Sequence, residues 1–173
     1  MRIVGLDPGL RFTGWGCIRV DDGGVLIYEG HGAIAVPLSL SLPQRLAQLF
    51  QELEGILTDL HPDGVTVEEV FVNRNGASTV KLCMARGVVL MAPARLGIPV
   101  FEYGANCIKK TVTGNGHADK NQIKTMVEFL LPKFRLAQQG QPYKADCSDA
   151  LAAALCHAQH ISIDQAKQRA LRT

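Results

Sequence analysis

The chain has 173 residues, of which 47% are hydrophobic and 20% charged, and its formal net charge is +2. These values are typical of one soluble globular domain with a sizeable core. No apolar run is long enough to span a membrane, and the segment GLDPG at 5–9 interrupts any signal peptide, so we expect a cytoplasmic protein with no membrane partner. The five cysteines are odd in number and include no C-x-x-C pair, which argues against a zinc site or disulfide framework and for free thiols.

The charged residues are unevenly distributed along the chain. Residues 45–70 carry one Arg and six acidic residues, whereas residues 109–144 carry seven Lys or Arg and two acidic residues. This asymmetry indicates a basic face beside an acidic site, although solvated helix faces would give the same composition.

The first eighteen residues predict a strand, a tight turn and a returning strand. Residues 1–6 form a short apolar run that delivers one carboxylate, Asp7, to the end of the first strand. Pro8-Gly9 predicts the turn, and residues 11–20 predict the returning strand.

Glycines in the returning strand indicate a close contact with its backbone. Gly14 and Gly16 leave room there for another element to approach. The turn sequence DDGG at 21–24 then leads into a third strand at 25–36, which completes an antiparallel meander.

A helix and a buried strand follow the meander. Ser41 and Gln44 have the spacing of a capping box, and apolar residues recur at helical spacing as far as residue 60. The turn at 61–64 ends this helix. The apolar run at 65–71 predicts a central strand parallel to the first.

Helices and strands also alternate in the second half of the chain. We expect, in order, a helix at 78–96, a strand at 98–103, helices at 105–112 and 118–131, a loop at 132–144 and a last helix at 145–160. Pro93 predicts a kink or an early end in the first of these helices. The chain therefore divides into a domain at 1–160 and a frayed basic tail at 161–173. This order predicts a mixed sheet with helices on both faces.

Two adjacent glutamates interrupt the strand at 65–71. Burying a carboxylate in a central strand is costly unless a cation or hydrogen bonds compensate it, so Glu68 and Glu69 are candidate site residues. Alternation sends their side chains to opposite faces, so only one can join Asp7. Spacing alone does not say which one.

Two further carboxylates begin the last helix. Asp146 and Asp149 are three residues apart and share one helix face, where capping chemistry also favours acidic residues. Together with Asp7 and a glutamate they give four hard oxygen ligands, which favour Mg²⁺ or Mn²⁺ over Zn²⁺. Two such ions would support phosphodiester cleavage. His157 lies on the same helix, and we expect it to be packed or hydrogen-bonded rather than a ligand.

Five segments in order resemble the RuvC family of bacterial Holliday junction resolvases. They are GLDPGLRFTGWG near the start, VEEVFVNRNG at 67–76, KLCMARG at 81–87, VFEYGANCIKKTVTGNGHADK at 100–120 and ADCSDALAAALCH at 145–157. The resemblance implies a ribonuclease H-like α/β fold, with a five-stranded mixed sheet and helices on both faces. It also implies a homodimer that cuts four-way DNA junctions with two Mg²⁺ per site, or Mn²⁺ as a substitute, in recombination and repair. The RuvA–RuvB branch-migration complex is an implied partner.

The resemblance also assigns roles to individual residues. Matched by motif, the family's catalytic, metal-binding acids fall on Asp7, Glu68, Asp146 and Asp149, which decides for Glu68 against Glu69. Its DNA-contacting positions fall on Phe71, Lys109 and Lys120.

Three other interpretations of the sequence compete with this one. The segment DPGLRFTG also fits the first phosphate loop of actin-like ATPases, but that fold needs two such domains and the chain is too short. A ribonuclease H-like nuclease that processes RNA shares the fold and the first acid. A non-catalytic junction-binding protein would not need all four acids.

Overall fold

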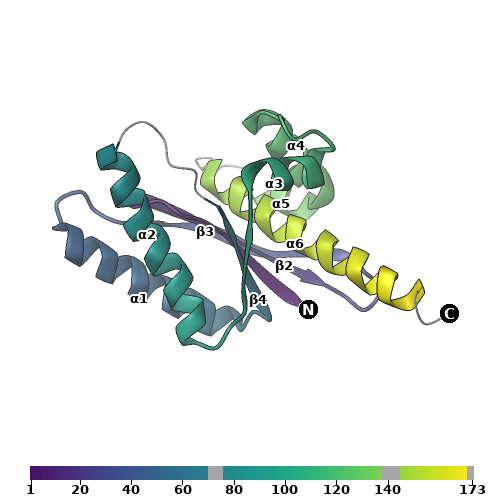
Figure 1. Ribbon diagram of the computed structural model, residues 1–173, viewed down its shortest axis with the longest axis horizontal. Coiled ribbons are helices and arrows are strands. Elements are labelled where there is room, and N and C mark those ends of the chain that lie inside the picture. Colours follow the sequence, from purple (N-terminus) through teal and green to yellow (C-terminus); the bar gives the residue numbers. More distant parts are fainter. Residues whose placement is uncertain (70–75, 138–144, 171–173) are drawn as a thin grey trace.

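The computed structural model describes residues 1–69, 76–137 and 145–170 (Figure 1). Five strands form one sheet in the order β3-β2-β1-β4-β5. Their bounds are Arg2–Asp7 for β1, Phe12–Val20 for β2, Leu26–Ala35 for β3, Gly64–Glu68 for β4 and Val100–Tyr103 for β5. The first three strands pair antiparallel, whereas β4 pairs parallel with both β1 and β5. The predicted meander, the mixed sheet and the central position of the fourth strand are therefore confirmed.

Helices cover both faces of the sheet, as predicted (Figure 1). Their bounds are Leu42–Leu60 for α1, Gly76–Arg95 for α2, Ala105–Thr113 for α3, Lys120–Leu130 for α4, Pro132–Ala137 for α5 and Ala145–Ala170 for α6. Side chains of α1 and α2 bury one face, and side chains of α3 to α6 bury the other. Successive side chains of β1 point to opposite faces of the sheet and so contribute to both cores. Ile3 faces α6, whereas Val4 faces α1 and α2.

Local signals in the sequence set the limits of α1. Ser41 is its N-cap, and Gln44 Oε1 accepts hydrogen bonds from the Ser41 backbone N–H at 3.0 Å and from its Oγ at 2.8 Å. The Gln44 half of the predicted capping box is therefore present. His61 ends the helix in the left-handed conformation, and its N–H donates to the Leu57 carbonyl at 3.0 Å.

Helix α6 lies directly on the backbone of β1 and β2. A Cβ atom at Gly5 would fall 1.8 Å from the Ala150 carbonyl oxygen, and one at Gly14 would fall 2.2 Å from the Asp146 carbonyl oxygen. A Cβ at Gly16 would clash with the Leu151 side chain. The close approach predicted at Gly14 and Gly16 is thus the contact with α6, which fixes the first turns of that helix against the sheet.

Three expectations differ from the structure. The predicted loop at 132–144 is wrong at its start, since residues 132–137 form α5 around Phe134, which is fully buried against Tyr28. Helix α6 continues to Ala170, ten residues beyond its predicted end. Pro93 falls in the last turn of α2, which ends two residues later without an earlier break. None of the helices in the described ranges is long and apolar enough to cross a membrane.

Candidate active site

Two of the predicted acids end neighbouring parallel strands. Asp7 is the last residue of β1 and Glu68 the last residue of β4. In the register of these strands Leu6 lies beside Val67, so the two acids emerge next to each other at the carboxyl edge of the sheet. Parallel pairing therefore brings together residues sixty-one positions apart in the sequence.

Helix α6 brings the other two acids to the same edge. The Asp146 backbone rests on Gly14, which is the β2 partner of Asp7. Asp149 lies one turn further along and reaches into the space beside Asp7 and Glu68. Absence of a side chain at Gly14 is what allows this turn of α6 to sit against the strand ends.

The acids border a cleft of about 370 Å³. Residues from β1, β4, α2, α3, α4 and α6 line it, and they are Asp7, Pro8, Glu68, Glu69, Leu82, Ala105, Ile108, Lys109, Lys120, Ile123, Asp149 and Ala152. Asp146 is not among the lining residues, but its charge acts on Asp7. The cleft is thus an acidic centre with two lysines on its walls.

Burial and mutual repulsion perturb the central carboxyls. Burial raises the pKa of Asp7 to about 8, and the negative charges of Asp149, Glu68 and Asp146 contribute to this rise, while Lys120 opposes them. Burial and the charge of Asp149 also raise the pKa of Glu68, against Lys109 and Lys120. Like charges held this close are costly unless a cation neutralises them.

Both predicted lysines lie at this centre. Lys120, the first residue of α4, places its Nζ 3.1 Å from Asp149 Oδ2, and Asp149 is the largest cause of its raised pKa. Lys109 projects from α3 into the cleft, where it acts on Glu68. Both lysine side chains therefore line the cleft together with the acids.

Glu69 also lines the cleft, contrary to the strict alternation expected from the sequence. Strand β4 ends at Glu68, and the Glu69 N–H donates to the Tyr103 carbonyl at 2.9 Å. Side chains alternate between the two faces of the sheet only within the strand. Glu69 lies beyond its end, so its side chain turns toward Gly104 at the rim of the cleft. Of these two glutamates, Glu68 alone contributes to the pKa shift of Asp7, which fits the choice of Glu68.

Two other residues considered in the sequence analysis are Phe71 and His157. Phe71 lies outside the described residues. His157 is buried, its Nδ1 lies 2.8 Å from the Tyr103 hydroxyl, and its ring centroid lies 4.0 Å from that of Phe101, so it is a packed and hydrogen-bonded residue, as expected.

The donor set of the cleft fits a hard divalent cation. It consists of carboxylate oxygens, which Mg²⁺ and Mn²⁺ prefer. Among the described residues, these carboxylates do not form a group of three with donor atoms all within 4.8 Å of one another. A cation that offsets their charge would allow these side chains to draw together.

Comparison with known proteins agrees with this geometry. The profile of the family described as crossover junction endodeoxyribonuclease RuvC matches residues 3–157. The chain belongs to the RuvC family. The chain is 48% identical to a crossover junction endodeoxyribonuclease RuvC of Rhodopseudomonas palustris, over 92% of this chain and 88% of the relative. It is 50% identical to that of Methylorubrum extorquens, over 92% of this chain and 81% of the relative.

A solved structure extends the match to three dimensions. Thermus thermophilus RuvC, in complex with a Holliday junction substrate, superposes with a TM-score of 0.83 at 28% identity, over 95% of this chain and 96% of that one. The ribonuclease H-like fold expected from the resemblance is confirmed. Membership of the RuvC family makes the chain an endodeoxyribonuclease, so the acidic cleft is its candidate active site.

Sequence reasoning missed the pairing of Lys120 with Asp149. The two residues lie on different helices and twenty-nine positions apart, and no spacing rule joins them. The surplus of basic residues at 109–144 was the available signal, and it placed cations near the acids without naming partners.

Proposed function

We propose that the chain resolves four-way (Holliday) DNA junctions by metal-dependent hydrolysis of phosphodiester bonds, during homologous recombination and DNA repair. The observation that carries this proposal is the meeting of Asp7, Glu68 and Asp149 in one cleft whose walls hold Lys109 and Lys120. A carboxylate centre can hold cations, and the lysines can hold the phosphates on either side of the cut.

The metal ligands of this proposal are Asp7, Glu68, Asp146 and Asp149. Two Mg²⁺, or Mn²⁺ in their place, would supply an activated water and stabilise the leaving oxygen. The raised pKa of Asp7 supports a cation there, because a cation would favour the ionised carboxyl that burial and its neighbours disfavour. Lys120 neutralises Asp149 before a cation and DNA bind.

DNA contacts extend from the cleft onto the basic elements. Lys109 and Lys120 bind backbone phosphates on the two sides of the acids. Phe71 follows Glu68 by three residues, and we assign it to stacking on an unpaired base at the opened centre of the junction. Stacking there would hold the strands apart while the scissile phosphate enters the cleft.

Symmetry supports a homodimer as the working form. A four-way junction presents two strands of like polarity related by an approximate two-fold axis, and a C₂ dimer would offer one cleft to each. We propose that this dimer works in the cytoplasm with the RuvA–RuvB branch-migration complex, which would supply the junction.

The test is cleavage of a synthetic junction by the full chain with Mg²⁺. A four-way junction should be cut by paired nicks, whereas a linear duplex and a structured RNA of the same length stay intact. Mn²⁺ should replace Mg²⁺, while Ca²⁺ should support binding without efficient cutting, because its larger and looser coordination positions water poorly. Preferential cutting of the RNA would favour the RNA-processing alternative. Zinc-only activity in metal-stripped protein would overturn the magnesium site.

A further inference from the structure

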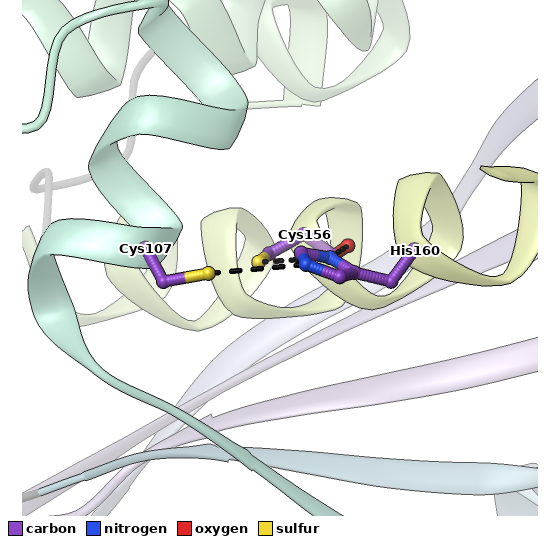
Figure 2. A group of neighbouring side chains, drawn as sticks. All are labelled: Cys107, Cys156 and His160. Atoms are coloured by element: carbon purple, nitrogen blue, oxygen red, sulfur yellow. Dashed lines mark hydrogen bonds between the residues drawn. The ribbon is translucent and has the colours of Figure 1, made fainter. Parts of the chain in front are cut away.

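A second group of side chains that can bind metal lies between α3 and α6 (Figure 2). None of its three members lines the acidic cleft. Cys107 comes from α3, and Cys156 and His160 lie one turn apart on α6. One donor atom from each side chain lies within 4.8 Å of the other two. Within residues 1–69, 76–137 and 145–170, no other group of three His, Cys, Asp or Glu side chains reaches this spacing.

Hydrogen bonds orient the imidazole for ligation. His160 Nδ1 lies 2.8 Å from the Cys156 carbonyl oxygen, so an Nδ1–H donor there leaves the lone pair on Nε2. Nε2 lies 3.9 Å from Cys107 Sγ, whereas Cys156 Sγ lies 3.7 Å from the other ring nitrogen, Nδ1 (Figure 2). Ligating histidines commonly donate their other N–H to a carbonyl in this way. Sulfur and nitrogen ligands of a tetrahedral zinc ion stand about 3.5 Å apart, so Cys107 and Nε2 need only a small closure. Cys156 Sγ must turn from Nδ1 toward the cation.

The group lies partly below the surface of the protein. Cys156 is buried, while Cys107 and His160 are partly exposed and leave an entry route. The Tyr103 ring covers His160 with centroids 4.9 Å apart, and the Thr111 hydroxyl is hydrogen-bonded to the Cys156 thiol.

We propose that Cys107, Cys156 and His160 bind one thiolate-preferring divalent cation, represented by Zn²⁺, which clamps α3 to α6. Two S–H bonds are replaced by two metal–sulfur bonds, two protons pass to solvent, neutral Nε2 is the third ligand and water the fourth. No oxidation state changes.

This clamp is separate from the acidic cleft and acts on its wall. Cys156 follows Asp149 by seven residues, about 10 Å along the helix axis. Helix α3 carries Ala105, Ile108 and Lys109, which line the cleft. A cation that ties α3 to α6 would therefore hold the lysine-bearing wall in place relative to the acids.

The experiment titrates metal-stripped full-length chain with Zn²⁺ or Co²⁺ under a non-thiol reductant. Excess Mg²⁺ is present to occupy carboxylates. We expect one equivalent of Co²⁺ to give a sulfur-to-cobalt charge-transfer band, and Zn²⁺ to abolish this band, release two protons and raise Tm. Cys107→Ser, Cys156→Ser or His160→Gln should weaken Zn²⁺ binding by more than the roughly 10- to 100-fold that removal of an outer partner costs.

Two matched variants serve as controls. Cys83→Ser removes the exposed thiol on α2, and Asp7→Asn alters the acidic cleft; both should bind Zn²⁺ as the parent does. X-ray absorption of the zinc-loaded parent should show two sulfurs and one imidazole nitrogen, a readout that needs no variant. Absence of the charge-transfer band, a shell of oxygen ligands only, or equal binding in the Cys156→Ser variant would overturn the proposal.

Discussion

Lys120 Nζ lies 3.1 Å from Asp149 Oδ2, which joins the start of α4 to the acidic cleft. Most of the Lys120 side chain is exposed, whereas only 14% of the Asp149 side chain is. A lysine that pairs with a buried acid at one end and faces solvent along its stem can also contact a phosphate that enters the cleft. The Lys120 ammonium group can therefore pair with Asp149 in the free protein and contact a DNA phosphate in the complex.

Lys120→Ala and Lys109→Ala should each weaken junction binding and flatten its salt dependence. Removing one lysine–phosphate interaction should reduce the slope of log K against log salt by about 0.9. Binding is measured with Ca²⁺ across a salt series. Lys124→Ala and Lys110→Ala are matched controls, because neither of these lysines lines the cleft and Lys124 lies 3.8 Å from Glu128. An unchanged slope for the cleft variants would remove these lysines from the DNA interface.

Removing the charge of any one of the four acids should abolish junction cleavage and leave junction binding largely intact. The substitutions are Asp7→Asn, Glu68→Gln, Asp146→Asn and Asp149→Asn. Metal ions contribute several kcal/mol to stabilising the transition state, and each 1.36 kcal/mol is tenfold in rate, so we expect cleavage to slow by about 10³-fold or more. Affinity comes mainly from Lys and Arg on phosphates and should persist. Single-turnover cleavage and gel-shift binding separate the two effects.

Glu69→Gln is the matched control for Glu68→Gln. Glu69 lines the rim but does not contribute to the pKa shift of Asp7, so its substitution should reduce cleavage only mildly. Full cleavage by Glu68→Gln together with no cleavage by Glu69→Gln would reverse the assignment of the two glutamates.

Asp7→Asn should also stabilise the metal-free protein at pH 8. The pKa of Asp7 is raised to about 8 in the folded state, so the folded chain binds a proton that the unfolded chain has released. Stability therefore falls as pH rises from the unfolded value near 4 to about 8, and asparagine removes this decrease. Each kcal/mol gained raises Tm by about 2–4 °C in a chain of this size.

Thermal unfolding in EDTA at pH 3.5 and pH 8 measures this effect. The stabilisation should be largest at pH 8 and small at pH 3.5, where both states are protonated. Mg²⁺ should then stabilise the parent more than the variant and reduce the difference between them. A variant less stable than the parent at pH 8 without metal would show that the Asp7 carboxylate is not strained by its neighbours.

The sequence predicted the positions of the four acids because strand pairing and helical spacing determine where they lie. Parallel strands end at one edge, so Asp7 and Glu68 meet there, and helical spacing places Asp146 and Asp149 in the first turns of α6. The same rules failed at Glu69, where the strand had already ended.

Contacts between elements remote in sequence carried no local signal. Phe134 is fully buried against the sheet, and this long-range packing makes a helix out of a segment predicted as a loop. Cys107 meets Cys156 and His160 across two helices, although the number and spacing of the cysteines argued against a zinc site. Such pairings depend on how helices cross the sheet, which periodicity does not encode.

Gly14→Ala should destabilise the fold and lower cleavage together. The new Cβ would fall 2.2 Å from the Asp146 carbonyl oxygen, so the first turn of α6 must move away from the strand ends. Overpacking of this kind costs about 1–3 kcal/mol, measured as a shift of the urea midpoint. Gly55→Ala in α1 has no atom within 4 Å of its Cβ and should gain up to about 1 kcal/mol. Equal effects of the two variants would argue against tight packing of α6.

The proposed dimer should use the exposed face of α2. Val80, Met84 and Met91 recur at helical spacing and are exposed by 53%, 42% and 52%, while Val88 at the same spacing packs partly onto the core. Replacing one exposed residue by a charge, as in Met84→Glu, should dissociate the dimer without unfolding the chain. Sedimentation measures the mass, and circular dichroism checks the fold. Gln51→Glu, which adds a charge at an exposed position on α1, is the control.

Mixing parent protein with an excess of Asp7→Asn protein should give heterodimers with one working cleft. If each cleft cuts one strand, these heterodimers should nick a four-way junction once and leave the strand of like polarity intact, whereas parent homodimers nick both. Denaturing gels with each strand labelled separately measure the ratio of single to paired nicks. A monomer by sedimentation, on and off the junction, that still cuts both strands would contradict the two-fold mechanism.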